Sequence, residues 1–116
     1  MVDPELVASH SQEVRRGSVV VASLLMLRTP GYGYGLIEAL SGAGIAVEAN
    51  TLYPLLRRLE KQGLLVSEWN TDEVRPRKFY RTSEAGEELA ALLRDEWTAL
   101  DRSMQAIDTA TRKGTP

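Results

Sequence analysis

Long cationic side chains gather in the middle of this 116-residue chain. Asn50, Arg57 and Lys61 are spaced so that a helix turning 100° per residue would carry all three on one face. The two cations could bind phosphate groups, and the asparagine amide could pair with the edge of an adenine. The alternative is an ordinary solvated helix face, which often carries the same residue types.

A second group of cations follows about fifteen positions later, at a turn between two stretches rich in apolar residues. Arg75, Arg77 and Lys78 could reach phosphates or a minor groove from a protruding turn. They could equally be charges that keep an exposed strand edge from pairing with other chains. Asp72 and Glu73 in the same turn reduce its attraction for an anion.

The charge is unevenly distributed along the chain. Residues 48–82 contain seven Lys and Arg against five Asp and Glu, a net charge of +2, whereas residues 83–116 contain four against seven, a net charge of −3. The overall charge of −2 argues against a tight nonspecific nucleic-acid binder, since phosphate neutralisation supplies most of that affinity. It leaves a sequence-specific binder open, because a binding footprint is a local patch.

Residue types that support catalysis are scarce. The chain has no cysteine and a single histidine, His10, so it offers no thiolate, no metal site and no acid–base cluster. Alternating glycines at positions 31, 33 and 35 are weak evidence for nucleotide binding. The longest apolar run, residues 19–27, is far shorter than the roughly 20 residues of a membrane span, and no signal pattern is present. We therefore expect a cytoplasmic protein that is not an enzyme and needs no cofactor, metal or membrane.

Apolar periodicity and turn residues predict the elements that position these cations. Three helices, a hairpin and a last helix in this order are typical of a winged helix-turn-helix, a mainly α fold with a small β-hairpin. The predicted segments are an N-terminal arm over 1–12, a winged helix-turn-helix domain over 13–82, a long dimerisation helix over 83–110 and a disordered tail over 111–116. Within the domain we expect a buried helix over 13–27, a short helix through Leu36, Ile37 and Leu40, a helix from Glu48 to Gly63 and a hairpin over 64–82.

Proline at position 54 conflicts with the third of these helices. An interior proline removes one backbone hydrogen bond and costs about 3 kcal/mol, so the propensities alone would start that helix at Pro54.

The last helix has an apolar stripe at spacings of four and three residues, close to the seam of a coiled coil. A helix of about 25 residues is about 37 Å long, which exceeds the small body it could cover, so we expect a partner helix from a second copy. Trp97 in this stripe is either an ordinary core residue or a flat surface for an aromatic ligand. The stripe comprises Leu89, Leu93, Trp97, Leu100, Met104 and Ile107.

Three stretches in order resemble the PadR family of transcriptional regulators. They are Tyr32-Gly33-Tyr34, the run from Thr51-Leu52-Tyr53-Pro54 through Arg58-Leu59-Glu60-Lys61 with Gly63, and Pro76-Arg77-Lys78-Phe79-Tyr80-Arg81. The match covers about residues 13–100, and the single C-terminal helix resembles the short subfamily. Asn50, Gly35 and Thr82 depart from the family pattern, which has a small glycine, an acidic residue and an aliphatic residue there; the first departure bears on operator preference.

The resemblance implies a winged-helix homodimer, usually a repressor, whose C-terminal helices form the dimer and whose DNA affinity falls when a small hydrophobic or aromatic effector binds. It also implies a recognition helix continuous through Pro54 and planar-ligand stacking at Trp97. The partners would be double-stranded DNA with an inverted-repeat operator, a second copy and the effector. The alternative is a winged-helix module that binds proteins and not DNA. The predicted DNA contacts are Asn50, Thr51, Tyr53, Arg57, Lys61, Arg75, Arg77 and Lys78.

Overall fold

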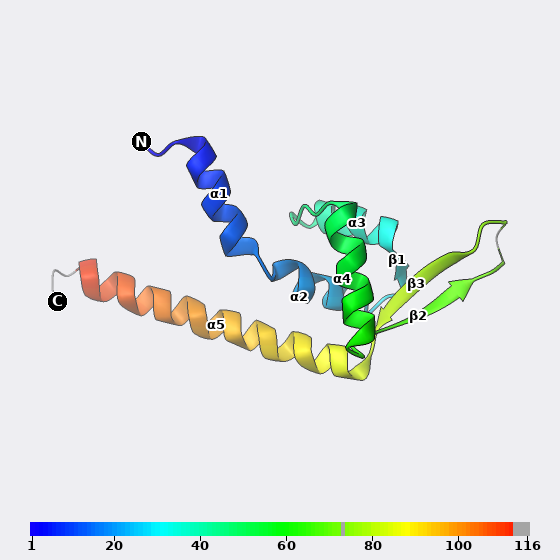
Figure 1. Ribbon diagram of the computed structural model, residues 1–116. Helices are drawn as coiled ribbons and strands as arrows, with labels where there is room; N and C mark the ends of the chain where they lie inside the picture. Colours follow the sequence, from blue (N-terminus) through cyan, green and yellow to red (C-terminus); the bar gives the residue numbers. More distant parts are fainter. Residues whose placement is uncertain (73, 113–116) are drawn as a thin grey trace.

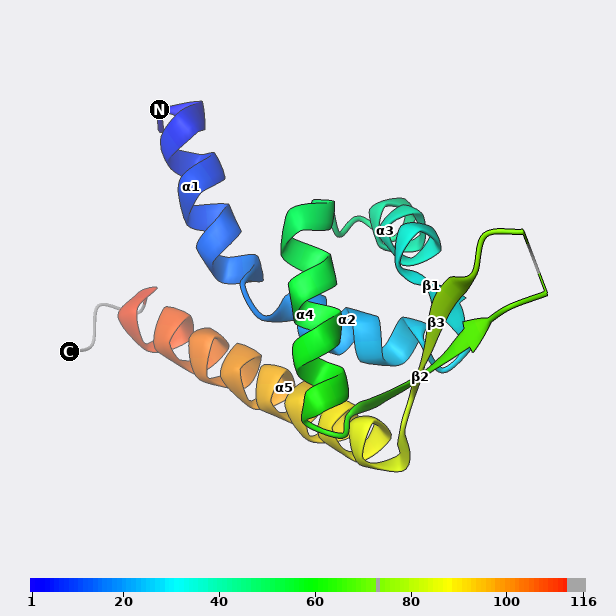
Figure 2. The ribbon, with the colours of Figure 1, turned by 45° about the vertical axis from the view of Figure 1, so that its right-hand side comes forward.

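The computed structural model describes residues 1–72 and 74–112 (Figure 1). The fold is mainly helical with a small antiparallel sheet, and Figure 2 shows its long last helix leaving the body at an angle. The elements are α1 (Pro4–Arg15), α2 (Ser18–Met26), β1 (Gly31–Tyr32), α3 (Gly33–Gly42), α4 (Ala49–Lys61), β2 (Leu65–Asn70), β3 (Arg77–Thr82) and α5 (Glu84–Arg112).

The N-terminal region differs from the predicted segments in where its helices begin and end. Residues 1–12, predicted as an N-terminal arm with no element assigned, are mostly helical, because α1 covers Pro4–Arg15 and the Asp3 carboxylate caps it by accepting from the Glu5 amide at 2.9 Å. The helix predicted to begin at Glu13 is also wrong at its start. The helical run ends at Arg15, because Arg16 has a non-helical ψ of 131°; Gly17 follows with a left-handed φ of +90°, and α2 begins only after it.

The pair α3 and α4 forms the helix-turn-helix, as predicted. The short helix through Leu36 and Leu40 is confirmed, and α4 runs unbroken through Pro54. The apolar side chains of α4 point into the body and bury one of its faces, which offsets the backbone hydrogen bond that the proline lacks.

The predicted hairpin is present, with β2 and β3 paired from Leu65 opposite Thr82 to Asn70 opposite Arg77. A third strand was not predicted: β1 pairs with β3, placing Tyr32 opposite Phe79, and the strand order is β1-β3-β2. The hairpin projects beyond the body on the side away from the ends of α1 and α5 (Figure 1).

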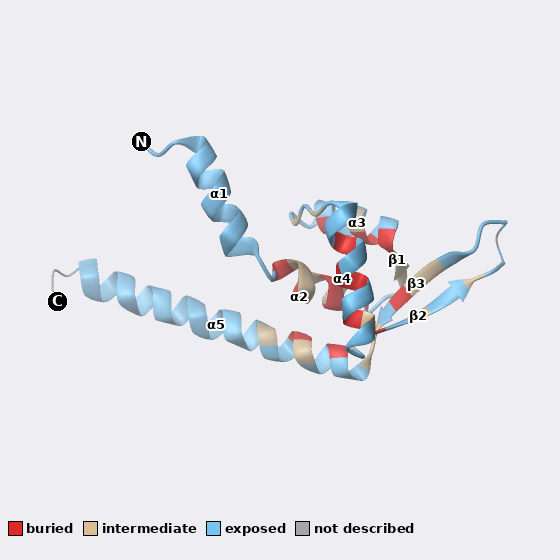
Figure 3. Ribbon diagram, viewed as in Figure 1, coloured by how far each residue is buried: buried red, intermediate tan, exposed pale blue. Residues whose placement is uncertain are grey.

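The core lies where α2, α3 and α4 meet the base of the sheet and the first turns of α5 (Figure 3). Ser83 caps α5 by accepting from the Gly86 amide at 3.1 Å, as its residue type predicts. An ion pair of 2.6 Å between Arg28 and Glu87 further joins the end of α2 to α5. The fully buried side chains include Leu24, Leu27, Leu40, Leu52, Leu56, Leu59 and Leu65.

Beyond its first turns α5 leaves the body and is exposed along most of its length (Figure 3). It continues to Arg112, past the predicted end, so positions 111 and 112 of the predicted tail are helical, whereas 113–116 lie outside the described residues. Within the described part of the chain no helix is both long and apolar enough to cross a membrane.

Candidate nucleic-acid interface

The outer face of α4 carries most of the residues predicted to contact DNA. Because Leu52, Leu55, Leu56 and Leu59 fill the inner face, the polar residues between them are directed outward. Asn50, Thr51, Arg57 and Lys61 are all exposed.

Tyr53 differs from these residues because part of its ring packs inside the molecule. It is 37% exposed, and its ring lies so close to Gly33 that a Cβ there would come within 2.4 Å of the ring atom Cε1. A side chain at position 33 would displace this ring, so Gly33 allows the close approach of α3 and α4, and Tyr53 combines a packing role with an exposed edge.

The wing, defined as β2, β3 and the turn between them, carries its cations on different surfaces. Successive side chains of a strand alternate between faces, so Arg77 and Lys78 point to opposite sides of β3. The Arg77 guanidinium lies 4.5 Å from the centre of the Tyr32 ring, and Tyr32 in turn accepts from the Asn70 amide at 2.9 Å. Arg75 is exposed in the turn; Glu73 lies outside the described residues.

Lys78 points toward α4 and forms an ion pair there. Its ammonium lies 2.9 Å from Oε1 of Glu60, and the Ser67 hydroxyl donates to Oε2 of the same carboxylate. The hydrogen bonds from Ser67 and Lys78 lower the pKa of Glu60, and the hydrogen bond to Glu60 raises the pKa of Lys78. Both side chains are charged at neutral pH, and the pair joins the wing to α4.

A shallow groove of about 540 Å³ lies between the C-terminal half of α4 and β3. Four of its lining side chains are cationic and one is a carboxylate, so it favours anions. Neither Arg58 nor Glu60 was among the predicted DNA contacts, and the role of Glu60 depends on how α4 packs against the wing. The lining residues are Arg57, Arg58, Glu60, Lys61 and Lys78.

The apolar stripe of α5 divides into two parts. Leu89 and Leu93 are half-buried near the body, whereas the later positions are largely exposed, with Trp97 at 47% and Leu100 at 55%. Leu92, which the predicted stripe omitted, is also exposed. The exposed stripe residues are Trp97, Leu100, Met104 and Ile107.

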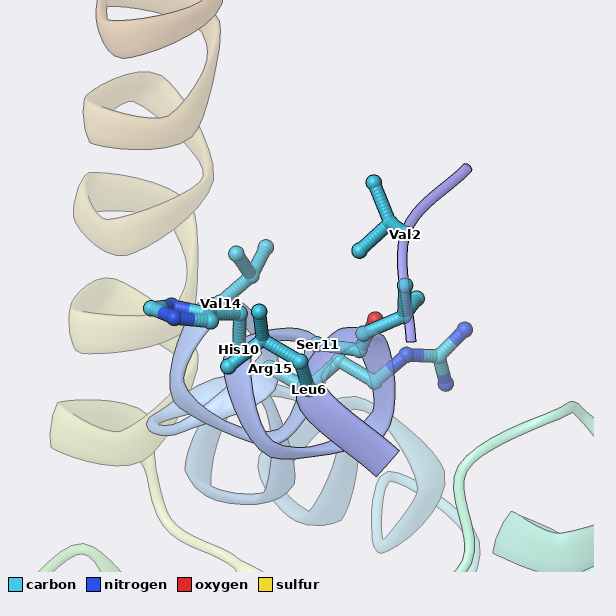
Figure 4. Close-up of a pocket in the computed structure, with 7 residues that line it drawn as sticks. Val2, Leu6, His10, Ser11, Val14 and Arg15 are labelled. Carbon is cyan, nitrogen blue, oxygen red and sulfur yellow. The ribbon is translucent and has the colours of Figure 1, made fainter. Parts of the chain in front are cut away.

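A second apolar surface lies on α1, where no functional residue was predicted. A hollow of about 380 Å³ runs along this helix, and Trp97 is not among its lining residues. Leu6, His10 and Val14 follow one another at four-residue spacing along it (Figure 4). A hydrogen bond of 2.7 Å from Arg15 to the Gly44 carbonyl links the end of α1 to the body.

Comparisons with known proteins agree with this geometry. The model of the PadR-like family of transcriptional regulators matches residues 23–92, more than half of the chain. A solved PadR family transcriptional regulator from Eggerthella lenta is 45% identical, with a TM-score of 0.85 over 89% of this chain and 92% of that one. A solved PadR-like transcription factor from Bacteroides fragilis is 32% identical, with a TM-score of 0.71 over 85% and 98% of the two chains.

A curated relative, the transcriptional regulator Rv3488 of Mycobacterium tuberculosis, is 47% identical over 64 residues. That match covers 55% of this chain and 58% of the relative's length. The likeness extends through the helix-turn-helix and the wing, and the family consists of transcriptional regulators and not of enzymes. The chain belongs to the PadR-like family of transcriptional regulators.

Proposed function

We propose that this protein is a homodimeric, sequence-specific DNA-binding repressor that acts in the cytoplasm. The outer face of α4 would enter the major groove while the wing lies on the backbone beside it. The observation that carries the proposal is the exposed row of Asn50, Arg57 and Lys61 on α4. The two cations of this row also line a groove in which cations outnumber carboxylates.

The residues of this surface divide by chemistry into two groups. Arg57, Lys61, Arg75 and Arg77 have long cationic side chains suited to phosphates, which fix position without reading sequence. Asn50 has an amide that can form two hydrogen bonds with adenine in the major groove, and Thr51 and Tyr53 lie beside it on the same helix.

The test compares Lys61→Gln with Asn50→Ala on a selected operator and on random DNA at several salt concentrations. Lys61→Gln should weaken binding to all sequences alike and flatten the salt dependence by about one phosphate per protomer. Asn50→Ala should cost about 1–3 kcal/mol on the operator, with little change on random DNA.

Arg102→Gln is the matched control, because this exposed cation lies in the outer half of α5, which points away from α4 and the wing (Figure 1). It should bind as the unchanged protein does. Equal losses for Asn50→Ala on both DNAs would contradict base reading, and no change in either test variant would contradict the placement of α4 in the groove.

Exposed apolar surface supports the homodimer. Four large apolar side chains of the predicted stripe on α5 and three of α1 are exposed, and both helices project from the same side of the body (Figure 2). Pairing with a second copy would remove this surface from water. The residues are Trp97, Leu100, Met104 and Ile107 on α5 and Leu6, Val7 and Val14 on α1.

The effector would be a small planar hydrophobic molecule that stacks on Trp97 between two protomers. The half-exposed indole supports this, since a flat aromatic surface near a symmetric interface can hold a planar ligand. Binding of the effector should change the indole fluorescence. Trp97→Ala should lower the affinity for the effector about fivefold or more, equivalent to about 1 kcal/mol. The role fails if a panel of planar aromatic compounds quenches the Trp97→Ala variant, which retains Trp69, as strongly as the unchanged protein.

The alternative, a winged-helix module that binds proteins and not DNA, rests on the net charge of −2. Salt titration separates the two functions. DNA binding through several phosphates weakens steeply between low and moderate salt, and a chain that binds no DNA at low salt supports the alternative.

A further inference from the structure

Side chains from α4, β2 and β3 meet at one carboxylate. Lys78 on β3 contacts one oxygen of Glu60 at 2.9 Å, and Ser67 on β2 donates to the other. A single residue of α4 thus binds both strands of the hairpin. Ser67 and Lys78 lie two register positions apart, on the face of the sheet that packs against α4.

This carboxylate also determines what Lys78 can reach. The Lys78 ammonium lies between the Glu60 carboxylate and the Tyr80 ring, whose centre is 5.2 Å away. Lys78 lines the same groove as Arg57 and Lys61, so without Glu60 it would be a further cation open to a phosphate. Glu60 itself, with a side chain 33% exposed, would repel a phosphate that entered the groove.

Resting on the proposed DNA-binding function, we propose that Glu60 is a positioning residue that orients the wing against α4 and holds Lys78 away from DNA phosphates. Its first effect is mechanical. β1 pairs only with Phe79 and Tyr80, so the rest of the hairpin is a two-stranded ribbon, which is only marginally stable by itself. This ribbon projects from the body (Figure 1), so a contact shared by both strands restricts its direction relative to α4.

The second effect of Glu60 is on specificity. Each phosphate contact adds affinity for every sequence alike, whereas discrimination depends on the difference between operator and random DNA. By keeping one cation of each protomer from phosphates, Glu60 lowers nonspecific affinity and makes binding depend more on base contacts. The proposal therefore assigns Lys78, which was predicted from the sequence as a DNA contact, to the ion pair with Glu60.

The test measures binding to operator and random DNA against salt for Glu60→Gln, which keeps the shape of the side chain and removes its charge. Random-DNA affinity should rise several-fold at low salt, and the salt dependence should steepen by about one phosphate per protomer. The ratio of operator to random affinity should fall. The double variant Glu60→Gln with Lys78→Gln should return the salt dependence to that of the unchanged protein, since the released cation is gone.

Glu68→Gln is the matched control. Glu68 lies on β2 on the opposite face of the wing, is exposed, and is opposite Phe79 in the register. Its substitution makes the same change in net charge without touching the pair. The proposal is overturned if Glu60→Gln leaves the salt dependence unchanged, if Glu68→Gln steepens it equally, or if the double variant stays steep.

A distance measurement tests the mechanical effect without DNA. The chain has no cysteine, so one cysteine at each of the exposed positions Gln62 and Thr71 can carry spin labels at the C-terminal end of α4 and on the wing. In protein diluted with unlabelled chain, Glu60→Gln should broaden the distance distribution, and Glu68→Gln should leave it narrow. An unchanged distribution in Glu60→Gln overturns the orienting role, whereas absent DNA binding by the unchanged protein contradicts only the proposed function.

Discussion

At the scale of single residues, the Glu60–Lys78 pair combines charge, hydrogen bonding and partial burial. Its side chains are 33% and 29% exposed, so solvent screens their attraction and the pair contributes about 0.5–1 kcal/mol to stability. The main effect of the pair is on the orientation of the wing: a wing held against α4 presents its cations at a defined angle to that helix.

The pH dependence of stability follows from the two pKa shifts. The pKa of Glu60 is lowered from its usual 4.5, so its contribution is present above that value and is lost as pH falls through the lowered pKa. The pKa of Lys78 is raised from 10.5, so its contribution is present below 10.5 and is lost as pH rises through the raised value.

Between these limits the free energy of unfolding of the unchanged protein should exceed that of Glu60→Gln by a constant amount of about 0.5–1 kcal/mol. The difference should shrink as pH falls below 4.5 and through the lowered pKa of Glu60, where the carboxylate of the folded protein becomes neutral. Denaturant unfolding from pH 3 to pH 9 measures it, and Glu68→Gln is the control. A difference that persists undiminished at pH 3 would contradict the assignment to this carboxylate.

At the scale of elements, the first turn of α5 presses against the loop between α4 and β2. The Ser83 amide donates to the Leu64 carbonyl at 3.0 Å, and the Ser83 hydroxyl donates to the Gly63 carbonyl at 2.6 Å. A Cβ at Gly86 would lie 2.2 Å from the Leu64 carbonyl oxygen. Only glycine lets the first turn of α5 lie this close to the loop that follows α4.

Gly86→Ala should therefore lower the free energy of unfolding by about 1–3 kcal/mol or more, because the backbone of the loop must shift. Gly35→Ala is the matched control: it is also a glycine inside a helix, and its added Cβ would have no atom within 4 Å. That variant should be unchanged or more stable by up to about 1 kcal/mol. Thermal and denaturant unfolding measure the free energy of unfolding of both variants. Equal values for Gly86→Ala and Gly35→Ala would contradict the close approach of α5 to the loop.

At the scale of the whole molecule, the shape of the chain favours pairing. Its extents are 65 × 33 × 21 Å, and much of the long dimension is α5, whose outer half consists of exposed residues. Two recognition helices held by such a dimer would bind half-sites about 10 base pairs apart or a multiple of that, arranged as an inverted repeat.

Leu100→Asp should disrupt this dimer, because it would place an unpaired carboxylate in the apolar seam. Light scattering at micromolar concentration should show a dimer for the unchanged protein and a monomer for the variant, and operator affinity should fall with dimer loss. Thr98→Asp introduces the same charge on the opposite face of α5 and should remain a dimer. A monomeric unchanged protein, or a variant that still pairs, would contradict the homodimer.

Much of the fold could be predicted from the sequence because its signals are local. The leucines of α4 repeat at helical spacing, and the hairpin has apolar stretches on both sides of a polar turn. The same periodicity placed Asn50, Arg57 and Lys61 together on the outer face, since one helix determines their relative positions. Only the proline within α4 required the family resemblance, because its local cost argued against the helix that packing stabilises.

Other features were decided by tertiary structure alone. The two-residue strand β1 has no pattern of its own and forms because β3, far along the chain, lies beside it. Glu60 and Lys78 are 18 positions apart and meet only because the hairpin folds back onto α4. The need for glycine at position 86 likewise arises from a loop more than twenty residues earlier. The physical reason is the same in each case: periodicity determines which face of an element is apolar, whereas contacts between elements depend on how those faces pack.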